Sequence, residues 1–165
     1  MKTTIFISLL MSSALFLRAQ QTYVPDDAFE YYLETHSSTG NTVSMGDASS
    51  MGDGVMNDSV PTAKIQDVTL LDVHSQHIAD LTGIEDFSSL QVLKCYDNQL
   101  TSLDVTNNTS LTQLFCYSNS LSTLDLSQNT DLQVLSCGFN QLTDLDLTNN
   151  IHWSPYMLII INLRI

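Results

Sequence analysis

The fold is decided by residues 90–105, which have the sequence LQVLKCYDNQLTSLDV. The pattern returns twice at a constant step, as LTQLFCYSNSLSTLDL in residues 111–126 and as LQVLSCGFNQLTDLDL in residues 132–147. A repeat period in the twenties is typical of a solenoid, in which each unit contacts only its neighbours. The sequence therefore predicts a stack of coils with a long side surface.

Three kinds of side chain recur in phase through these coils. They are Cys95, Cys116 and Cys137, then Asn98, Asn119 and Asn140, then Asp104, Asp125 and Asp146. Each cysteine stands where the repeat needs a small inward apolar group, and free cysteine behaves as a small buried hydrophobe. One disulfide with a leftover thiol is the alternative. Three buried thiols are favoured, because equivalent side chains of parallel strands point the same way, and this geometry suits a disulfide bond poorly. The asparagines are expected to be buried and bonded to the backbone of an adjacent coil.

The repeats occupy residues 64–150, as about four coils with a period of about 21 to 22 residues. The first coil is a variant, because the step from Val68 to Leu90 is slightly longer than the later steps from Leu90 to Leu111 and on to Leu132. After residue 150 the phase is lost, because Trp153 and Tyr156 stand where a further coil needs leucines. Residues 151–165 are interpreted as an aberrant apolar tail. The tail is either a crude terminal strand or, as we favour, a frame-shifted and truncated end.

Residues 1–20 have the pattern of a signal peptide. Lys2 supplies a positive end, residues 5–17 are almost entirely apolar, and Ala19 is a small residue before the expected cut. An N-terminal anchor or a buried helix is the alternative, although the apolar run is too short to span a bilayer. We therefore expect a secreted or cell-surface protein whose mature chain starts near Gln20 or Gln21 and has no transmembrane segment.

Residues 21–63 are expected to form a cap and a loop. The stretch from Thr22 to Glu34 predicts a short helix, with Pro25 and Asp26 as start signals. Residues 36–57 are polar and rich in Gly and Ser, which indicates a loop. The spacing of their acidic residues does not match a calcium-binding loop, so no metal site is predicted.

The charge of the chain excludes some partners. After cleavage of the leader, Lys64, Lys94 and Arg164 remain against 18 acidic residues. No basic patch can hold phosphates, so neither nucleic acid nor an anionic membrane surface is an expected partner.

The motif L-x-x-L-x-C-x-x-N-x-L is the leucine-rich repeat signature with cysteine at its sixth position. From Tyr23 to Asn150 the chain resembles internalin-like leucine-rich repeat proteins of bacterial surfaces. Residues 23–29 and 80–87 look like those of large exported proteins that often end in a type IX secretion sorting domain. The resemblance implies an α/β-type solenoid with parallel strands on a concave face, a short N-terminal helical cap and an irregular convex side. It also implies a binding scaffold, with no catalytic residues and no cofactor.

Candidate ligand-binding residues are those that project outward from the expected strands. They are Asp72, His74, Lys94, Tyr96, Asp97, Phe115, Tyr117 and Phe139. Exposed aromatic side chains in a cluster mark binding surfaces, although such a cluster can equally stabilise a sheet by cross-strand pairing.

Two features allow other chemistry. His74 beside Asp72, with Ser75 as a nucleophile, is a weak enzyme signal. The acidic ladder of Asp104, Asp125 and Asp146 is interpreted as exposed carboxylates or turn caps, with shared cation binding as the alternative.

The sequence thus favours a non-catalytic recognition module that binds a protein, or possibly a glycan, on its concave face. The alternative is a fragment of a larger secreted multidomain enzyme or adhesin, in which the repeats serve as a spacer or targeting segment.

Overall fold

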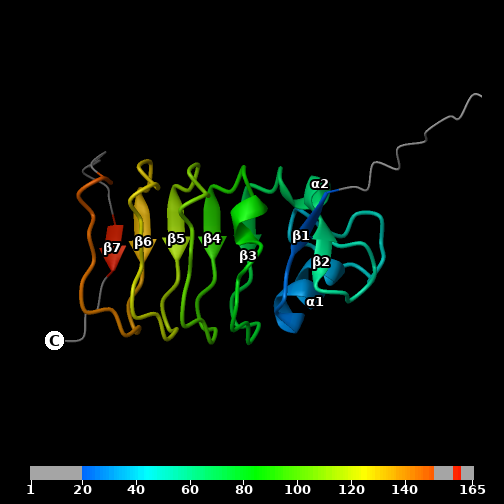
Figure 1. Cartoon of the computed structure of the whole chain (residues 1–165), viewed down its shortest axis with the longest axis horizontal. Coiled ribbons are helices and arrows are strands. Elements are labelled where there is room, and N and C mark those ends of the chain that lie inside the picture. The colour runs from blue at the N-terminus through cyan, green and yellow to red at the C-terminus, as the bar shows by residue number, and fades with distance from the viewer. Residues whose placement is uncertain (1–19, 151–157, 161–165) are drawn as a thin grey trace, which may run out of the picture.

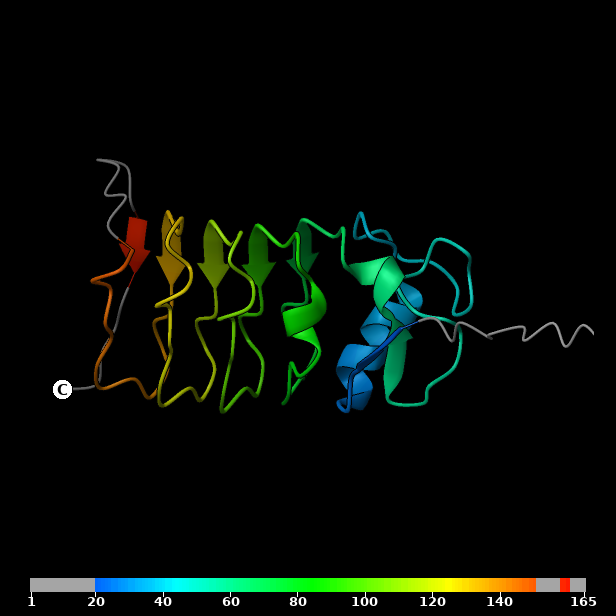
Figure 2. The same cartoon turned by 45° about the horizontal axis from the view of Figure 1, so that its top comes forward.

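The computed structural model describes residues 20–150 and 158–160. Its main feature is a five-stranded sheet in the order β3-β4-β5-β6-β7, with every neighbouring pair parallel. Figures 1 and 2 show the coils stacked side by side, with the helical cap at one end. The strands are β3 (Leu70–Asp72), β4 (Val92–Lys94), β5 (Gln113–Phe115), β6 (Val134–Ser136) and β7 (Leu158–Ile160).

The register of the sheet confirms the predicted solenoid. Leu93 pairs with Leu71 on one side and with Leu114 on the other, and Leu114 pairs with Leu135. Each of these leucines is the buried centre of a three-residue strand. Because side chains alternate across a strand, the residues before and after it face outward. The buried leucines and cysteines of successive coils join into one continuous core.

Strand β7 does not follow the constant step of the preceding coils. Leu135 pairs with Leu114 on one side and with Ile159 on the other. The step from Leu135 to Ile159 is longer than the step from Leu114 to Leu135, so the last coil contains more residues than the one before it. For residues 158–160 the structure therefore shows the terminal strand that was the less favoured interpretation of the tail. The remainder of the predicted tail, like residues 1–19 of the predicted signal peptide, lies outside the described residues.

The cap begins with a strand rather than a helix. Strand β1 (Gln21–Tyr23) pairs antiparallel with β2 (Ser59–Pro61), so the prediction of helix from Thr22 was wrong for the first residues. Helix α1 spans Asp27–Thr35, and the short helix α2 spans Thr62–Ile65. On α1, Phe29 is fully buried, and its ring stacks on that of Phe87 at a centroid distance of 6.3 Å. This contact joins the cap to the start of the repeats.

The predicted loop 36–57 is fastened to α1 by two buried carboxylates. The Glu34 carboxylate accepts a hydrogen bond of 2.7 Å from the Asp53 backbone N–H and another from Gly54. Glu30 accepts bonds of 2.8 and 3.0 Å from the N–H groups of Asn57 and Ser59. Both glutamates are almost fully buried. Their role is thus to organise the loop, and the sequence pattern alone gave no sign of it.

The turn between the variant coil and the first regular coil requires glycine. Gly83 has φ +104°, and a Cβ there would lie 2.7 Å from the Tyr23 carbonyl oxygen of β1. Gly83 directly precedes a 3₁₀ turn, η1 (Ile84–Asp86). The lack of a side chain therefore lets the cap approach the repeats closely.

Candidate functional site

The strand face is the surface formed by outward side chains of β3 to β6 and of the turns that follow them. Its residues are arranged in rows, because each coil places the same repeat position beside its neighbour. The strand pairing aligns Asp72, Lys94, Phe115 and Ser136 in one row. The next row holds His74, Tyr96, Tyr117 and Gly138, and the last holds Ser75, Asp97, Ser118 and Phe139. All eight predicted ligand-binding residues therefore fall on this one surface.

On the strand face, Asp72 is paired with both His74 and Lys94. The Asp72 carboxylate lies between two partners, 2.5 Å from the His74 Nδ1 and 3.1 Å from the Lys94 Nζ. These contacts hold the pKa of Asp72 below its usual range, although burial acts in the opposite direction and is the largest single influence. Asp72 therefore contributes little uncompensated charge to the surface.

The second row forms a stack of rings. The His74 ring lies 4.7 Å from the Tyr96 ring with an interplanar angle of 13°, and the Tyr96 ring lies 4.5 Å from the Tyr117 ring at 8°. All three side chains are half-buried. Because Gly138 follows in the next coil, the row has no fourth ring. The stack gives a continuous and partly apolar strip across the coils of β3, β4 and β5, in which both faces of the Tyr96 ring are covered.

The third row has an unusual backbone conformation. Ser75, Asp97, Ser118 and Phe139 all have φ between 53° and 55°, in the left-handed region. This geometry lets the N–H groups of Asp97 and Ser118 bond to carbonyls of the following coil at 3.1 and 3.0 Å. For a bulky residue such as Phe139 the conformation costs about 1–2 kcal/mol. Phe139 is nevertheless 72% exposed, so its ring gains little burial in return.

Three further positions refine the predicted surface. Phe115 is half-buried beside Lys94, and Ser136 and Gly138 are buried although they occupy outward repeat positions. The accessible part of the strand face is therefore centred on β4 and β5, with Phe139 at its edge.

The predicted asparagine ladder bonds to the backbone of neighbouring coils. The Asn98 Nδ2 donates to the Val73 carbonyl at 2.8 Å, and its Oδ1 accepts from the Ile78 N–H at 3.0 Å. Asn119 and Asn140 repeat the arrangement one and two coils later. The expectation that all three are buried was wrong for two of them: Asn140 is buried, whereas Asn98 and Asn119 are half-buried at the edge of the turn.

The cysteines lie in the core as free thiols. Cys95, Cys116 and Cys137 are all buried and unpaired with one another. Burial raises the pKa of Cys95 to about 12 and that of Cys137 to about 11, because the thiolate would lose its hydration. These residues pack the interior and offer no reactive nucleophile at neutral pH.

A second asparagine ladder was missed in the sequence. Asn108, Asn129 and Asn150 also follow one another in phase with the repeat, and all three are buried. The Asn129 Nδ2 donates to the carbonyls of Val105 and Asn108, both at 2.9 Å. The repeat spacing alone could have found this ladder. It fastens the side of each coil that lies away from the sheet.

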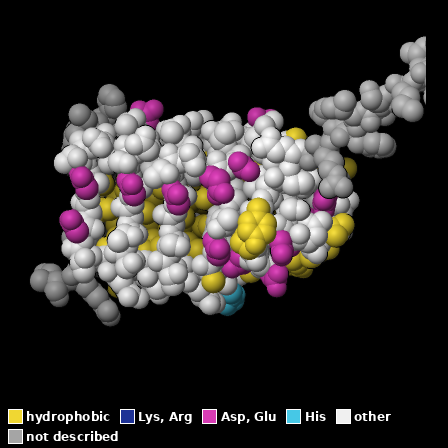
Figure 3. Space-filling view, viewed as in Figure 1, with side chains coloured by type: hydrophobic (Ala, Val, Ile, Leu, Met, Phe, Trp, Pro, Cys, Tyr) yellow, Lys and Arg dark blue, Asp and Glu magenta, His cyan; other side chains and the backbone are white. Residues whose placement is uncertain are grey.

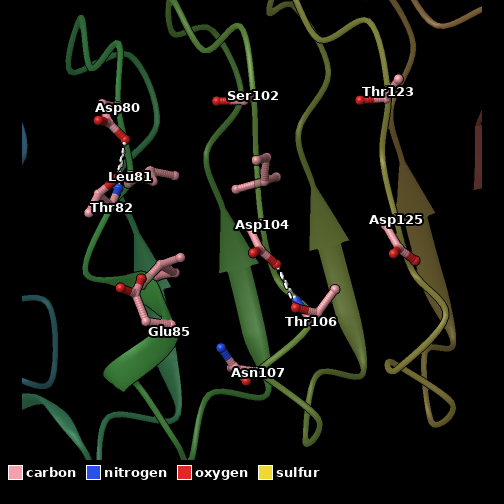
Figure 4. A pocket seen from close by; sticks show the side chains of 12 residues that line it. Asp80, Leu81, Thr82, Glu85, Ser102, Asp104, Thr106, Asn107, Thr123 and Asp125 are labelled. Carbon is pink, nitrogen blue, oxygen red and sulfur yellow. Dashed lines mark hydrogen bonds between the residues drawn. The ribbon is translucent and has the colours of Figure 1, made fainter.

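The returning segments of the coils, opposite the strands, carry a shallow acidic groove of about 430 Å³. Asp80, Glu85, Asp104 and Asp125 line it, and Figure 4 shows their side chains beside Ser102, Thr106 and Thr123. Figure 3 shows a row of acidic side chains along an apolar band, with no lysine or arginine visible on that face.

The acidic ladder forms turns in its own coils. The carboxylates of Asp104, Asp125 and Asp146 each accept a hydrogen bond of 2.9 to 3.0 Å from the N–H two residues later. Among the described residues no group of three or more His, Cys, Asp or Glu could hold a metal ion. The hydrogen bonds to Thr106, Ser127 and Thr148 show the carboxylates in the role of turn caps, the first of the two interpretations considered.

Each repeat contributes a short parallel strand, a turn asparagine and an inward apolar set, and together these define a leucine-rich repeat solenoid. A segment of 52 residues is 42% identical to Internalin J of Listeria monocytogenes serotype 4b (strain F2365), covering 32% of this chain and 6% of that protein. The chain is an internalin-like leucine-rich repeat protein.

Solved structures support this assignment. The functional domain of InlJ from Listeria monocytogenes, which includes a cysteine ladder, aligns with a TM-score of 0.64 and 30% identity, over 86% of this chain and 28% of that chain. The internalin InlF from Listeria monocytogenes str. 4b F2365 aligns with a TM-score of 0.60 and 22% identity, over 74% of this chain and 33% of that chain, and shows the fold alone. This chain thus spans a third or less of these relatives. No model of a protein family matches it.

One observation bears on membranes. Within the described residues, no helix has the length and apolar character needed to cross a bilayer.

Proposed function

We propose that this chain is a non-catalytic recognition module of an exported protein, and that its strand face binds a protein partner. The observation that carries the proposal is the stack of Tyr96 on Tyr117, extended by His74, on an accessible face of a rigid sheet. Aromatic side chains supply large contact areas at low cost in conformational entropy, and a few of them usually dominate an interface.

The distribution of charge supports the same surface. Asp72 and Asp97 are the two acidic residues of the strand face, out of 18 in the chain. Asp72 is paired with Lys94 and His74. The centres of protein interfaces are depleted of charge and enriched in aromatic residues. The strand face has this composition, whereas the acidic groove on the opposite side does not.

Phe139 adds a second argument. A phenylalanine that is exposed and held in a left-handed conformation contributes little to the core and costs conformational energy. Contact with a partner would bury its ring and offset that cost.

The enzyme alternative has less support from the geometry. The His74 ring is stacked on Tyr96 and its Nδ1 is occupied by Asp72. Among the described residues no hydrogen bond joins the Ser75 hydroxyl to His74. A nucleophile activated by a histidine needs that contact.

The proposal is tested first by site-specific crosslinking. A photoreactive phenylalanine analogue at Tyr117 should capture a protein from the surroundings of the exported chain, whereas the same analogue at Thr123, an exposed residue on the opposite side, should not. The captured protein is then purified and its affinity measured directly.

The affinity measurement tests whether the strand face is the surface that binds the captured protein. Replacing Tyr96 and Tyr117 with Ala should weaken binding by about 2 kcal/mol or more, which is roughly 30-fold. The control variant, with Ala at Thr106 and Ser127, should bind as the wild type. Equal affinities for both variants would exclude the strand face as the recognition surface.

A further inference from the structure

The backbone of Asp97 is fixed beside the tyrosine stack. The Asp97 N–H donates a hydrogen bond of 3.1 Å to the Tyr117 carbonyl oxygen, which fixes the Asp97 backbone against the next coil. The left-handed φ of 54° at Asp97 sets the direction of its side chain. Asp97 follows Tyr96 directly and its backbone is bonded to Tyr117, so this residue is a neighbour of both tyrosines of the stack.

Asp97 differs from Asp72 in having no compensating charge. The Asp72 carboxylate contacts both Lys94 and His74, whereas no hydrogen bond or ion pair to the Asp97 carboxylate is found within the described part of the chain. Asp97 is also exposed. Because Lys94 is already bound to Asp72 at 3.1 Å, its charge is largely neutralised. Asp97 is therefore the uncompensated charge of the strand face.

The tyrosine hydroxyls are acceptors next to this charge. The pKa of Tyr117 is raised above its ordinary value, first by partial desolvation and then by the neighbouring Tyr96 and the Asp97 carboxylate. Together these three neighbouring residues offer one carboxylate and two phenolic oxygens on the strand face.

We propose that Tyr96, Asp97 and Tyr117 form a subsite for an arginine side chain of the protein partner, an inference that rests on the proposed function of the strand face. A guanidinium group is planar and has five donors in a fixed fork, which can bond to a carboxylate in bidentate fashion and donate further hydrogen bonds to phenolic oxygens. An ammonium group is a compact and strongly hydrated charge that matches this combination less well.

The subsite can be tested before any partner is known. The probe is the blocked tripeptide acetyl-Gly-Arg-Gly-amide, titrated into the isotope-labelled protein and followed by NMR. Saturable shifts should concentrate on Tyr96, Asp97 and Tyr117. The matching peptides with lysine or with the uncharged arginine analogue citrulline should bind more weakly.

Two variants of equal charge provide the control. Asp97→Asn removes the carboxylate charge while keeping a residue type that tolerates the left-handed conformation, and it should weaken binding of the arginine peptide about tenfold. Asp125→Asn makes the same change on the opposite face and should leave that binding unchanged. Equal losses in the two variants, or shifts spread over the acidic groove, would show that the attraction is general and overturn the subsite.

The two proposals fail in different ways. A partner that loses affinity on replacement of Tyr96 and Tyr117 but not on Asp97→Asn would preserve the recognition surface and eliminate the arginine subsite. Arginine-peptide binding that depends on Asp97, with partner affinity unaffected by the tyrosine changes, would eliminate the recognition surface and leave Asp97 as an arginine-binding residue that the partner does not use.

Discussion

The Asp26 carboxylate accepts a hydrogen bond of 2.8 Å from the Ala79 backbone N–H, across 53 residues of sequence. The same oxygen, Oδ2, accepts a second bond from Asp80 at 3.0 Å. The other oxygen, Oδ1, caps helix α1 by accepting from the N–H groups of Ala28 and Phe29. One side chain therefore both starts the cap helix and ties it to the first coil.

This double role predicts a graded effect on stability. Asp26→Ser retains a cap for α1 but cannot reach both sets of donors, and should cost about 1–2 kcal/mol of unfolding free energy. Asp26→Ala loses both functions and should cost about 2–4 kcal/mol. Urea denaturation measures the difference. Asp27→Ala, at the neighbouring exposed position, should cost clearly less than Asp26→Ala. A Ser variant as stable as the wild type would contradict the bridging role, and equal stabilities of the Ser and Ala variants would contradict the capping role.

The contact between α1 and the loop predicts an intolerant glycine. A Cβ at Gly52 would overlap the Glu34 carboxyl group. Gly52→Ala should therefore displace that carboxylate from the Asp53 and Gly54 N–H groups and destabilise the cap by about 2–3 kcal/mol. Hydrogen exchange at the amides of residues 53 and 54 should accelerate. Gly40→Ala is the control, because a Cβ at Gly40 meets nothing within 4 Å and should leave the exchange of residues 53 and 54 unchanged, even though its φ of +80° adds backbone strain. Unchanged exchange in Gly52→Ala would show that Glu34 does not hold the loop.

The second asparagine ladder predicts a position-specific cost. Asn129→Ala removes two hydrogen bonds and leaves the buried carbonyls of Val105 and Asn108 without that donor. The unfolding free energy should fall by about 2–4 kcal/mol. Asn107→Ala removes the same group from an exposed position and should change it by less than about 0.5 kcal/mol. Denaturant midpoints of the two variants compare them directly, and similar midpoints would be inconsistent with a structural ladder.

The buried thiols predict low reactivity. All three cysteines are free and buried, so a thiol reagent should react slowly with the native chain and titrate three thiols after denaturation without a reductant. Finding one thiol and a stable disulfide would contradict this arrangement.

The same thiols predict that stability falls at high pH. An unfolded cysteine has a pKa of about 8.5, whereas burial raises the folded pKa of Cys137 to about 11. Between these values the folded chain keeps a proton that the unfolded chain has lost. Stability is therefore complete below the unfolded pKa and decreases as the pH rises toward the folded value.

The variant Cys137→Ala isolates this effect. Its loss of unfolding free energy between pH 9 and 10 should be smaller than that of the wild type by up to about 1.4 kcal/mol per pH unit. Tyr32, whose pKa burial raises to about 12, is present in both proteins and cancels in the comparison. Identical pH slopes would mean that Cys137 is ionised as readily in the folded state as in the unfolded state.

The sequence by itself determined the architecture of the repeats. The constant repeat period aligned Leu93 with Leu114, and alternation within each strand decided which side chains enter the core and which form the strand face. Such local patterns are sufficient because each coil repeats the geometry of its neighbour. The same rule would have found Asn108, Asn129 and Asn150 had the spacing been followed through every position.

The tertiary structure alone decided how the cap is attached and which charged side chains of the strand face are paired. The bond from Asp26 to Ala79 and the burial of Glu34 under the loop depend on the path of the intervening chain, which no repeat encodes. Composition also cannot tell that Asp72 is neutralised while Asp97, on the same face, has no partner among the described residues. Both are aspartates on the outer surface of a coil. Only the distances from Asp72 to Lys94 and His74 show which of the two carboxylates is paired.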